Sequence, residues 1–177
     1  MEQLPTVLES KQQFKGRVFS VRTDTLQQDG KQHRVDIVEH AGAFAIAAIP
    51  SPGHIILVRQ YRHAAGRYLW EIPAGTSEND EECEDGARRE LREETGFTVQ
   101  TLEEICCVYP TPGFCTERVH IYIAEGLSAG EQELDEDEAI EVKAFSLQEA
   151  MSMQASGEIA DMKTVLALLW LLGRQRI

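Results

Sequence analysis

Apolar and polar residues follow one another along the chain in a pattern that predicts many short strands and three helices. Residues 17–27 are rich in β-branched and aromatic types, and residues 33–40 alternate after an Asp29 and Gly30 pair, which together predict a hairpin. Helix-forming composition, a helix stop at Gly96 and a cap at Ser146 predict helices over residues 80–95, 146–154 and 161–172. Further apolar runs predict strands over residues 43–49, 54–61, 67–72, 98–109, 118–124 and 140–145.

The order of these elements predicts an α/β protein with a small appendage. We expect residues 1–42 to form an N-terminal antiparallel β-sheet and residues 43–177 to form the main domain. In that domain, strands and helices interleave without a regular βαβ rhythm, which indicates an α/β sandwich with a mixed sheet. The turn residues 50–53 lie between two apolar runs and predict that residues 43–49 and 54–61 pair as a hairpin.

Charge and cysteine content exclude several classes of protein. The chain has 17 Lys and Arg against 30 Asp and Glu, a formal net charge of -13, which disfavours a broad basic surface for a nucleic acid polymer. It contains no apolar run of about 18 residues and begins without a signal-peptide pattern, so we expect a cytoplasmic protein without membrane contacts. The four cysteines lack CxxC and accompanying histidine spacing, which favours buried thiols over a zinc site or disulfides.

The acidic residues gather in two segments. Residues 78–94 hold nine acids and three arginines, and residues 131–141 hold seven acids and no base. One explanation is a solvated helix face followed by an acidic loop. The other is that the two segments converge on divalent cations, because ions such as Mg²⁺ prefer clustered carboxylate oxygens.

The first acidic segment favours the cation hypothesis. At about 100° per residue, Glu90, Glu93 and Glu94 share one face within a single helical turn, where their repulsion destabilises the helix unless cations neutralise it. Arg89 stands four residues before Glu93 and is a candidate to orient it. The helical wheel nevertheless places Arg89 on the solvent side, with Glu82, Asp85 and Arg92. The acids lie beside an apolar row of Cys83, Ala87 and Leu91.

Residues 75–97, GTSENDEECEDGARRELREETGF, resemble the Nudix box. In that motif a glycine, a glutamate six positions later and REUxEExGU follow in fixed spacing, where U is a bulky apolar residue. The specified positions are all present, as Gly75, Glu81, Arg89, Glu90, Leu91, Glu93, Glu94, Gly96 and Phe97. The resemblance implies the Nudix α/β/α sandwich and a loop, helix and loop that hold Mg²⁺ or Mn²⁺ to cleave a diphosphate linked to another group. It assigns the metal to Ala74 (through its carbonyl), Glu90, Glu93 and Glu94, with Arg89 and Glu81 as orienting partners.

The surroundings of the box resemble the ADP-ribose pyrophosphatase subgroup of that family. LWEIPAG precedes the box, QYRH lies upstream, and YPTPGFCTE follows, with Pro112 sixteen residues after Gly96. Taken alone, Pro112 is better explained as an ordinary loop proline. The combined resemblance implies hydrolysis of ADP-ribose, or a similar nucleoside diphosphate sugar, to AMP and ribose 5-phosphate. It also implies a homodimer in which the N-terminal sheet crosses to the second subunit and helps to bind the adenine.

Several residues outside the box are candidates for substrate binding. Arginines near a strand end suit phosphate or ribose oxygens, and a glutamate suits an adenine amine or a ribose hydroxyl. Each has an ordinary alternative: solubility for the arginines, an ion pair with an arginine for Glu71, and core packing for Phe114. The candidates are Arg59, Arg62, Glu71, Gly113, Phe114 and Glu117, and the resemblance adds Arg17 and Phe19 from the N-terminal sheet.

Hydrolysis also requires a carboxylate that accepts a proton from the attacking water. Glu93 in the box is one candidate, and the resemblance adds Glu136 and Glu138 from the second acidic segment, which a solvated loop explains equally well. Two other functions remain open. One is hydrolysis of a different nucleoside diphosphate derivative, such as a GDP-sugar, a dinucleoside polyphosphate or coenzyme A. The other is a non-catalytic sensor that binds ADP-ribose.

Overall fold

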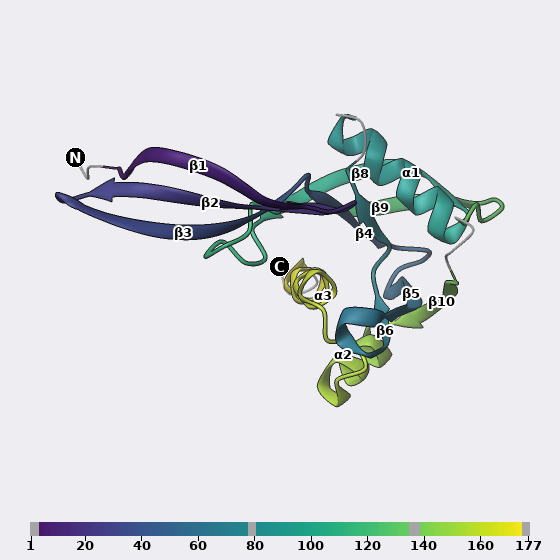
Figure 1. The fold of residues 1–177 in the computed structure, drawn as a ribbon. Coiled ribbons are helices and arrows are strands. Elements are labelled where there is room, and N and C mark those ends of the chain that lie inside the picture. Colours follow the sequence, from purple (N-terminus) through teal and green to yellow (C-terminus); the bar gives the residue numbers. More distant parts are fainter. Residues whose placement is uncertain (1–3, 78–80, 135–138, 175–177) are drawn as a thin grey trace. The chain divides into compact units, whose positions relative to one another are not determined.

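The structure is a computed structural model, and it describes residues 4–77, 81–134 and 139–174 (Figure 1). A short 3-10 helix, η1, spans His63–Ala65. The helices are α1 (Cys83–Thr95), α2 (Leu147–Ser156) and α3 (Met162–Arg174). The strands are β1 (Thr6–Lys15), β2 (Phe19–Gln28), β3 (Lys31–His40), β4 (Ala43–Ala48), β5 (His54–Arg62), β6 (Arg67–Glu71), β7 (Ala74–Thr76), β8 (Phe97–Val108), β9 (Val119–Ala129) and β10 (Glu141–Ser146).

The chain divides into two compact units. Met1–Gly42 and Val108–Arg118 form one unit, and Ala43–Cys107 and Val119–Ile177 form the other. The smaller unit contains an antiparallel sheet in the order β1-β2-β3. Its predicted hairpin is confirmed: Asp29 and Gly30 adopt φ values of 49° and 75°, as the two central residues of a type I′ turn require.

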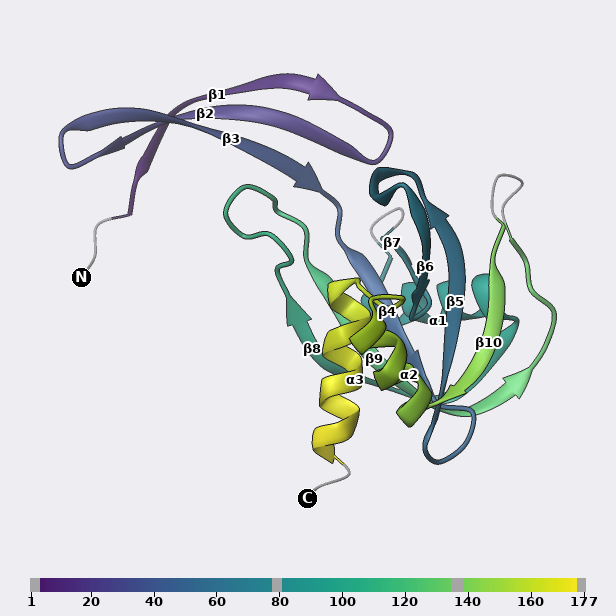
Figure 2. The same cartoon turned by 90° about the horizontal axis from the view of Figure 1, so that it is seen from below.

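The larger unit is a mixed α/β structure, as the sequence predicts. It holds a four-stranded sheet in the order β7-β4-β9-β8 and a three-stranded sheet in the order β10-β5-β6. Helix α1 covers one face of the four-stranded sheet and α3 covers the other (Figure 1). Helix α2 lies next to α3 (Figure 2). Among the described residues, no helix is both long and apolar enough to cross a bilayer.

The predicted hairpin between residues 43–49 and 54–61 is wrong. Strand β4 pairs with β7 and runs parallel to β9 from Ala43 beside Val119 to Ala48 beside Ala124. Strand β5 instead joins the other sheet, between β10 and β6. Strand β4 is buried over most of its length and β5 is buried from Ile55 to Val58, so their apolar sequences carry no alternation that identifies a partner. The turn between them therefore connects two sheets.

Local signals at the helix ends are confirmed. Gly96 ends α1 in the left-handed region at φ 75°, and its N–H donates to the carbonyl of Arg92 over 2.8 Å. Ser146 caps α2: its hydroxyl accepts from the N–H of Glu149, and the Glu149 carboxylate accepts from the Ser146 N–H. The capped helices are thus placed by residues that the sequence alone identifies.

Candidate metal and diphosphate site

Helix α1 approaches the sheet closely, and glycine makes this possible. A β-carbon on Gly86 would overlap the ring of Phe44 in β4, so only glycine fits at that helical position. Ala87 and Leu91 are fully buried against the same sheet, as the predicted apolar row requires. Cys83 packs against this cluster from the first turn of the helix. The packing fixes the rotation of α1 about its axis and therefore the direction in which its carboxylates point.

The side chains of the three predicted metal-binding glutamates are largely shielded from solvent. The side chains of Glu90 and Glu93 are 12% and 28% exposed, and Glu94 is buried at 4%. Glu94 Oε2 accepts a hydrogen bond of 2.9 Å from the N–H of Ala74, which brings the predicted backbone ligand beside a predicted carboxylate ligand. The explanation of a solvated helix face is therefore excluded for this group.

Arg89 connects the glutamates instead of facing solvent. Its guanidinium lies 2.9 Å from Glu81, 3.0 Å from Glu90 and 2.8 Å from Glu93, and its side chain is 25% exposed. Hydrogen bonding to Glu81 outweighs the opposing effect of burial and, with the charge of Glu90, holds the pKa of Arg89 above its ordinary value. The predicted orientation of Glu93 by Arg89 is present, but the solvent-side placement of Arg89 is wrong.

Wheel geometry misplaced Arg89 because a long side chain does not follow the angle of its α-carbon. The guanidinium reaches back to Glu81, which lies before the helix begins at Cys83, as expected for a residue at the helix entrance. The negative charge of the carboxylates attracts the guanidinium. This attraction outweighs the small cost of holding the arginine side chain along the helix surface. The signal available in the sequence was the motif itself, which contains both residues.

The donor set fits a hard divalent cation. Three carboxylates, those of Glu81, Glu90 and Glu93, pair with the one guanidinium of Arg89. The buried carboxylate of Glu94 on the same helix adds a fourth negative charge, so a net negative charge remains where solvent access is limited. The donors are oxygen atoms, which Mg²⁺ and Mn²⁺ prefer. Gly75 completes the fit, because a side chain there would occupy the position of the Glu90 carboxylate. Sequence reasoning identified Gly75 through the motif without this physical reason.

The second acidic segment is attached to the end of α1. The N–H of Glu133 donates to the Glu93 carbonyl over 3.0 Å, and the Glu133 carboxylate pairs with Arg92 at 2.8 Å. A β-carbon on Gly96 would lie 2.9 Å from the carbonyl oxygen of Gly130, so the two segments pass too closely for a larger residue. The predicted bases Glu136 and Glu138 lie outside the described residues.

Glu71 is buried in an ion-pair network. Arg62 donates two hydrogen bonds to its carboxylate, at 2.9 and 2.7 Å, and Lys163 donates a third from α3. Burial opposes the charged form of Glu71, but the hydrogen bonds from Arg62 and the charge of Lys163 outweigh it and lower its pKa. The alternative explanation for Glu71, an ion pair with an arginine, is therefore confirmed, and the arginine is Arg62. Lys163 was missed, because it is 92 residues away and has no motif.

Arg59 lies at a small pocket on the three-stranded sheet. Its guanidinium stacks over the Tyr68 ring, 4.6 Å from the centroid, and lies 3.4 Å from a Glu141 oxygen. Glu141 of β10 is directly opposite Arg59, and Tyr68 of β6 lies diagonally across, two residues from the Trp70 that is opposite Arg59. The pocket has a volume of about 240 Å³ and is lined by Arg59, Tyr68, Trp70, Glu141 and Glu158.

The remaining predicted substrate residues lie in the smaller unit. Arg17 and Phe19 line a pocket of about 280 Å³ at the start of β2. Phe114 is 56% exposed, which excludes the alternative of core packing, and its carbonyl accepts from the Val38 N–H over 2.8 Å. Gly113 is exposed, and Glu117 is half-buried.

Comparison with known proteins extends these observations. The NUDIX domain model matches residues 39–169. The ADP-ribose pyrophosphatase of Bacillus subtilis (strain 168) is 42% identical over 161 residues, which cover 89% of this chain and 87% of the relative. The methanol dehydrogenase activator of Bacillus methanolicus is 37% identical over 167 residues, covering 93% and 90%.

A solved structure supports the same relationship. The crystal structure of an ADP compounds hydrolase matches with a TM-score of 0.85 and 25% identity, covering 99% of this chain and 98% of that one. The family match spans most of the chain and includes helix α1 with its Glu90, Glu93 and Glu94 cluster. This protein belongs to the NUDIX family.

Proposed function

We propose that this protein is a metal-dependent pyrophosphatase that hydrolyses ADP-ribose, or a similar nucleoside diphosphate sugar, to AMP and ribose 5-phosphate. The observation that carries the proposal is the partly desolvated group of Glu90, Glu93 and Glu94 on one turn of α1, with Arg89 paired to Glu90 and Glu93. The choice of substrate is supported by similarity to the ADP-ribose pyrophosphatase of Bacillus subtilis and to the ADP compounds hydrolase.

The proposed metal ligands are Glu90, Glu93, Glu94 and the carbonyl of Ala74, with Mg²⁺ or Mn²⁺ as the ion. The bound cation supplies positive charge that neutralises the diphosphate and the charge that develops on it during hydrolysis. The buried Glu94 anchors the site, since its hydrogen bond to Ala74 holds the loop of Gly75 against the helix. Without a cation, the carboxylates and a diphosphate would repel each other, so metal and substrate bind interdependently.

Arg89 is proposed as the positioning residue of the site. One guanidinium nitrogen donates to Glu93 Oε2 and the other faces Glu81, so Arg89 fixes the Glu93 carboxylate relative to the helix entrance. A fixed carboxylate accepts a proton from an attacking water in a constant geometry. Glu93 is one candidate for this base, and Glu136 and Glu138 are the others.

Substrate contacts are proposed from two groups of residues. In the larger unit, Arg59 and Arg62 offer guanidinium groups, with Glu71 as the partner that orients Arg62. In the smaller unit, the exposed ring of Phe114 and the pocket at Arg17 and Phe19 offer surfaces for a base or a ribose. Gly113 and Glu117 complete the proposed set.

We propose a homodimer that forms through the β1-β2-β3 sheet. This sheet exposes large apolar side chains, among them Val7 at 55%, Phe14 at 53% and Phe19 at 44%, and such a patch favours association with a second copy. Sedimentation should give a dimer for the natural chain and a monomer for Val7→Lys combined with Phe14→Lys. The control Leu169→Lys changes an equally exposed residue on α3 and should leave the dimer intact. A monomeric natural chain at micromolar concentration would contradict the proposal.

A cytoplasmic location is proposed as well. The four cysteines are free and half-buried, an arrangement suited to a reducing compartment. Fractionation of cells that express the tagged protein would test this proposal, and recovery outside the cytoplasmic fraction would contradict it.

The decisive test of activity combines variants, a chelator and several substrates. Glu93→Gln and Glu94→Gln should each lower kcat on ADP-ribose by at least about 100-fold, while far-ultraviolet circular dichroism stays unchanged. The control Glu84→Gln alters an exposed carboxylate of the same helix, which pairs with Arg88, and should retain activity. A chelator should abolish hydrolysis, and Mg²⁺ or Mn²⁺ should restore it.

Assays of a GDP-sugar, a dinucleoside polyphosphate and coenzyme A should give lower kcat/KM than ADP-ribose. Full activity in both glutamine variants would reject the proposed site. Tight binding of ADP-ribose without product after long incubation would instead favour a sensor.

A further inference from the structure

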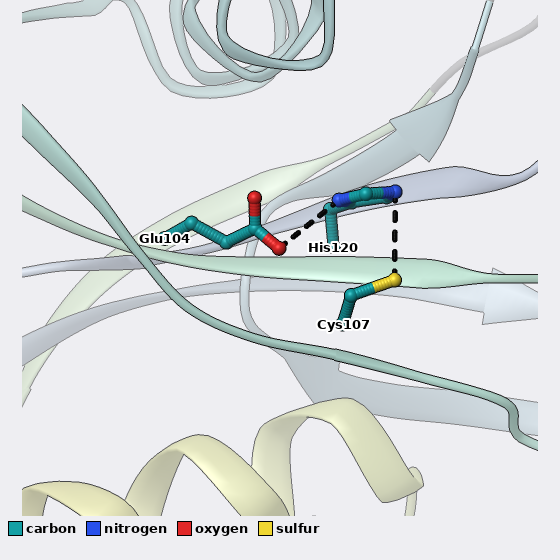
Figure 3. A group of neighbouring side chains, drawn as sticks. All are labelled: Glu104, Cys107 and His120. Atoms are coloured by element: carbon teal, nitrogen blue, oxygen red, sulfur yellow. Dashed lines mark hydrogen bonds and ion pairs between the residues drawn. The ribbon is translucent and has the colours of Figure 1, made fainter.

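Three side chains with metal-binding atoms meet on the four-stranded sheet, and none of them is a proposed ligand of the carboxylate site. Glu104 and Cys107 come from β8, and His120 comes from the neighbouring strand β9 (Figure 3). Their potential ligand atoms lie within 4.8 Å of one another. His120 lies 13 residues after Cys107 and 16 residues after Glu104 in the sequence, and the two strands bring them together. No short sequence motif therefore identifies this group.

The distance between sulfur and nitrogen fits a shared metal ion. Cys107 Sγ lies 3.5 Å from His120 Nε2. A tetrahedral zinc ion bound to sulfur at about 2.3 Å and to nitrogen at about 2.05 Å separates these two atoms by roughly 3.6 Å. The sulfur and the nitrogen therefore already have the separation that two ligands of one tetrahedral zinc ion require.

Glu104 contacts the second nitrogen of the His120 imidazole, Nδ1. Its Oε1 lies 3.2 Å from His120 Nδ1. When Nδ1–H donates to Glu104, the lone pair of Nε2 points toward Cys107. A carboxylate that orients a metal-binding histidine in this way is a common feature of protein metal sites.

The surroundings leave room for the rest of a coordination shell. The side chain of His120 is 18% exposed and that of Glu104 is 40% exposed, so water can reach the site. The ring of Phe44, 6.4 Å from the imidazole between centroids, limits the motion of His120 on the sheet. The site thus combines a fixed pair of donors with access for solvent ligands.

We propose that Cys107 and His120 bind a thiophilic divalent cation such as Zn²⁺, with Glu104 as the residue that positions His120. This site differs in chemistry from the carboxylate site of α1, because a sulfur and an imidazole select borderline and soft ions whereas oxygen donors select Mg²⁺ and Mn²⁺. It is independent of the proposed pyrophosphatase function. Water molecules fill the remaining positions.

Cobalt binding to the full-length chain tests the proposal directly. Co²⁺ replaces Zn²⁺ in tetrahedral sites, and a thiolate ligand gives a charge-transfer absorption in the near ultraviolet. With thiols kept reduced by a phosphine, the natural chain should develop this band and saturate at one equivalent. The band should persist in excess Mg²⁺ and in the double variant Glu93→Gln and Glu94→Gln, which separates it from the carboxylate site.

Matched variants assign the ligands. Cys107→Ser should abolish the band, whereas Cys106→Ser, which alters the adjacent thiol of the same strand, should keep it. His120→Gln should weaken cobalt binding and change the visible spectrum, and it provides a second variant if Cys107→Ser does not fold. Glu104→Gln should keep the band with about 10- to 100-fold weaker binding, as expected for a residue that acts through another.

The absence of the band in the natural chain would overturn the proposal and leave an ordinary thiol–imidazole contact. Its survival in folded Cys107→Ser, or its loss in folded Cys106→Ser, would also overturn the proposal.

Discussion

Gly75 and Glu90 are packed so closely that a β-carbon on the glycine would overlap the carboxyl group of the glutamate. Gly75 does not adopt a positive φ, so its backbone would accept other residues. The requirement for glycine comes instead from the space taken by the Glu90 carboxylate. Glycine at the first position of the motif is thus required by its contact with Glu90 across the site.

Replacing Gly75 tests this relationship. Gly75→Ala should displace Glu90 from the other carboxylates and lower kcat on ADP-ribose by about 100-fold, because a displacement near 1 Å can have that effect. The apparent affinity for Mg²⁺ should weaken as well. Gly173→Ala is the matched control, since it adds the same methyl group where no atom lies within 4 Å. Natural kinetics in Gly75→Ala would contradict the assignment of Glu90.

Arg89→Lys tests whether the guanidinium is needed for its shape. Lysine keeps the positive charge but cannot join Glu81 and Glu93 through separate nitrogens as Arg89 does. We expect kcat to fall by about 10- to 100-fold, as for other residues that orient ligands, with partial recovery at high Mg²⁺. Arg88→Lys is the control, because Arg88 pairs with the exposed Glu84. Equal kinetics for the two variants would show that charge alone suffices.

The network around Glu71 predicts a dependence of stability on pH. Because its pKa is lowered in the folded protein, Glu71 stabilises the fold fully above its unfolded pKa, and this contribution is lost as the pH falls through the folded pKa. Glu71→Gln should lower the free energy of unfolding at pH 7 by on the order of 3 kcal/mol. The difference from the natural chain should shrink below about pH 4.

Urea unfolding at several pH values measures this effect. The control Glu84→Gln removes an exposed partner of Arg88 and should cost only about 0.3–0.5 kcal/mol. A difference between Glu71→Gln and the natural chain that stays constant from pH 7 to pH 3 would contradict the prediction.

Much of the fold and the carboxylate site could be predicted because their signals are local. The stop at Gly96, the cap at Ser146 and the turn at Asp29 and Gly30 each depend on a few adjacent residues. The spacing of Glu90, Glu93 and Glu94 within one turn predicts that they share a face of the helix. Burial of Leu91 fixes the rotation of α1 and therefore the direction of that face.

The features that could not be predicted depend on contacts between distant residues. The parallel pairing of β4 with β9 joins residues 76 positions apart, and β4, which is apolar throughout, does not indicate its partner. Lys163 reaches Glu71 from a helix near the other end of the domain. Cys107 and His120 meet only because β8 and β9 are neighbours. Chain topology determines each of these contacts.

Helix α3 also affects the order in which the site can assemble during synthesis. The hydroxyl of Thr164 accepts a hydrogen bond of 2.8 Å from the N–H of Ile72, two residues before Ala74, and neighbouring Lys163 binds Glu71. The strand end that leads into the Gly75 loop is therefore anchored by helix residues that lie 92 positions later in the chain. The box residues therefore lack this anchor until α3 has been translated and has packed against the strand end.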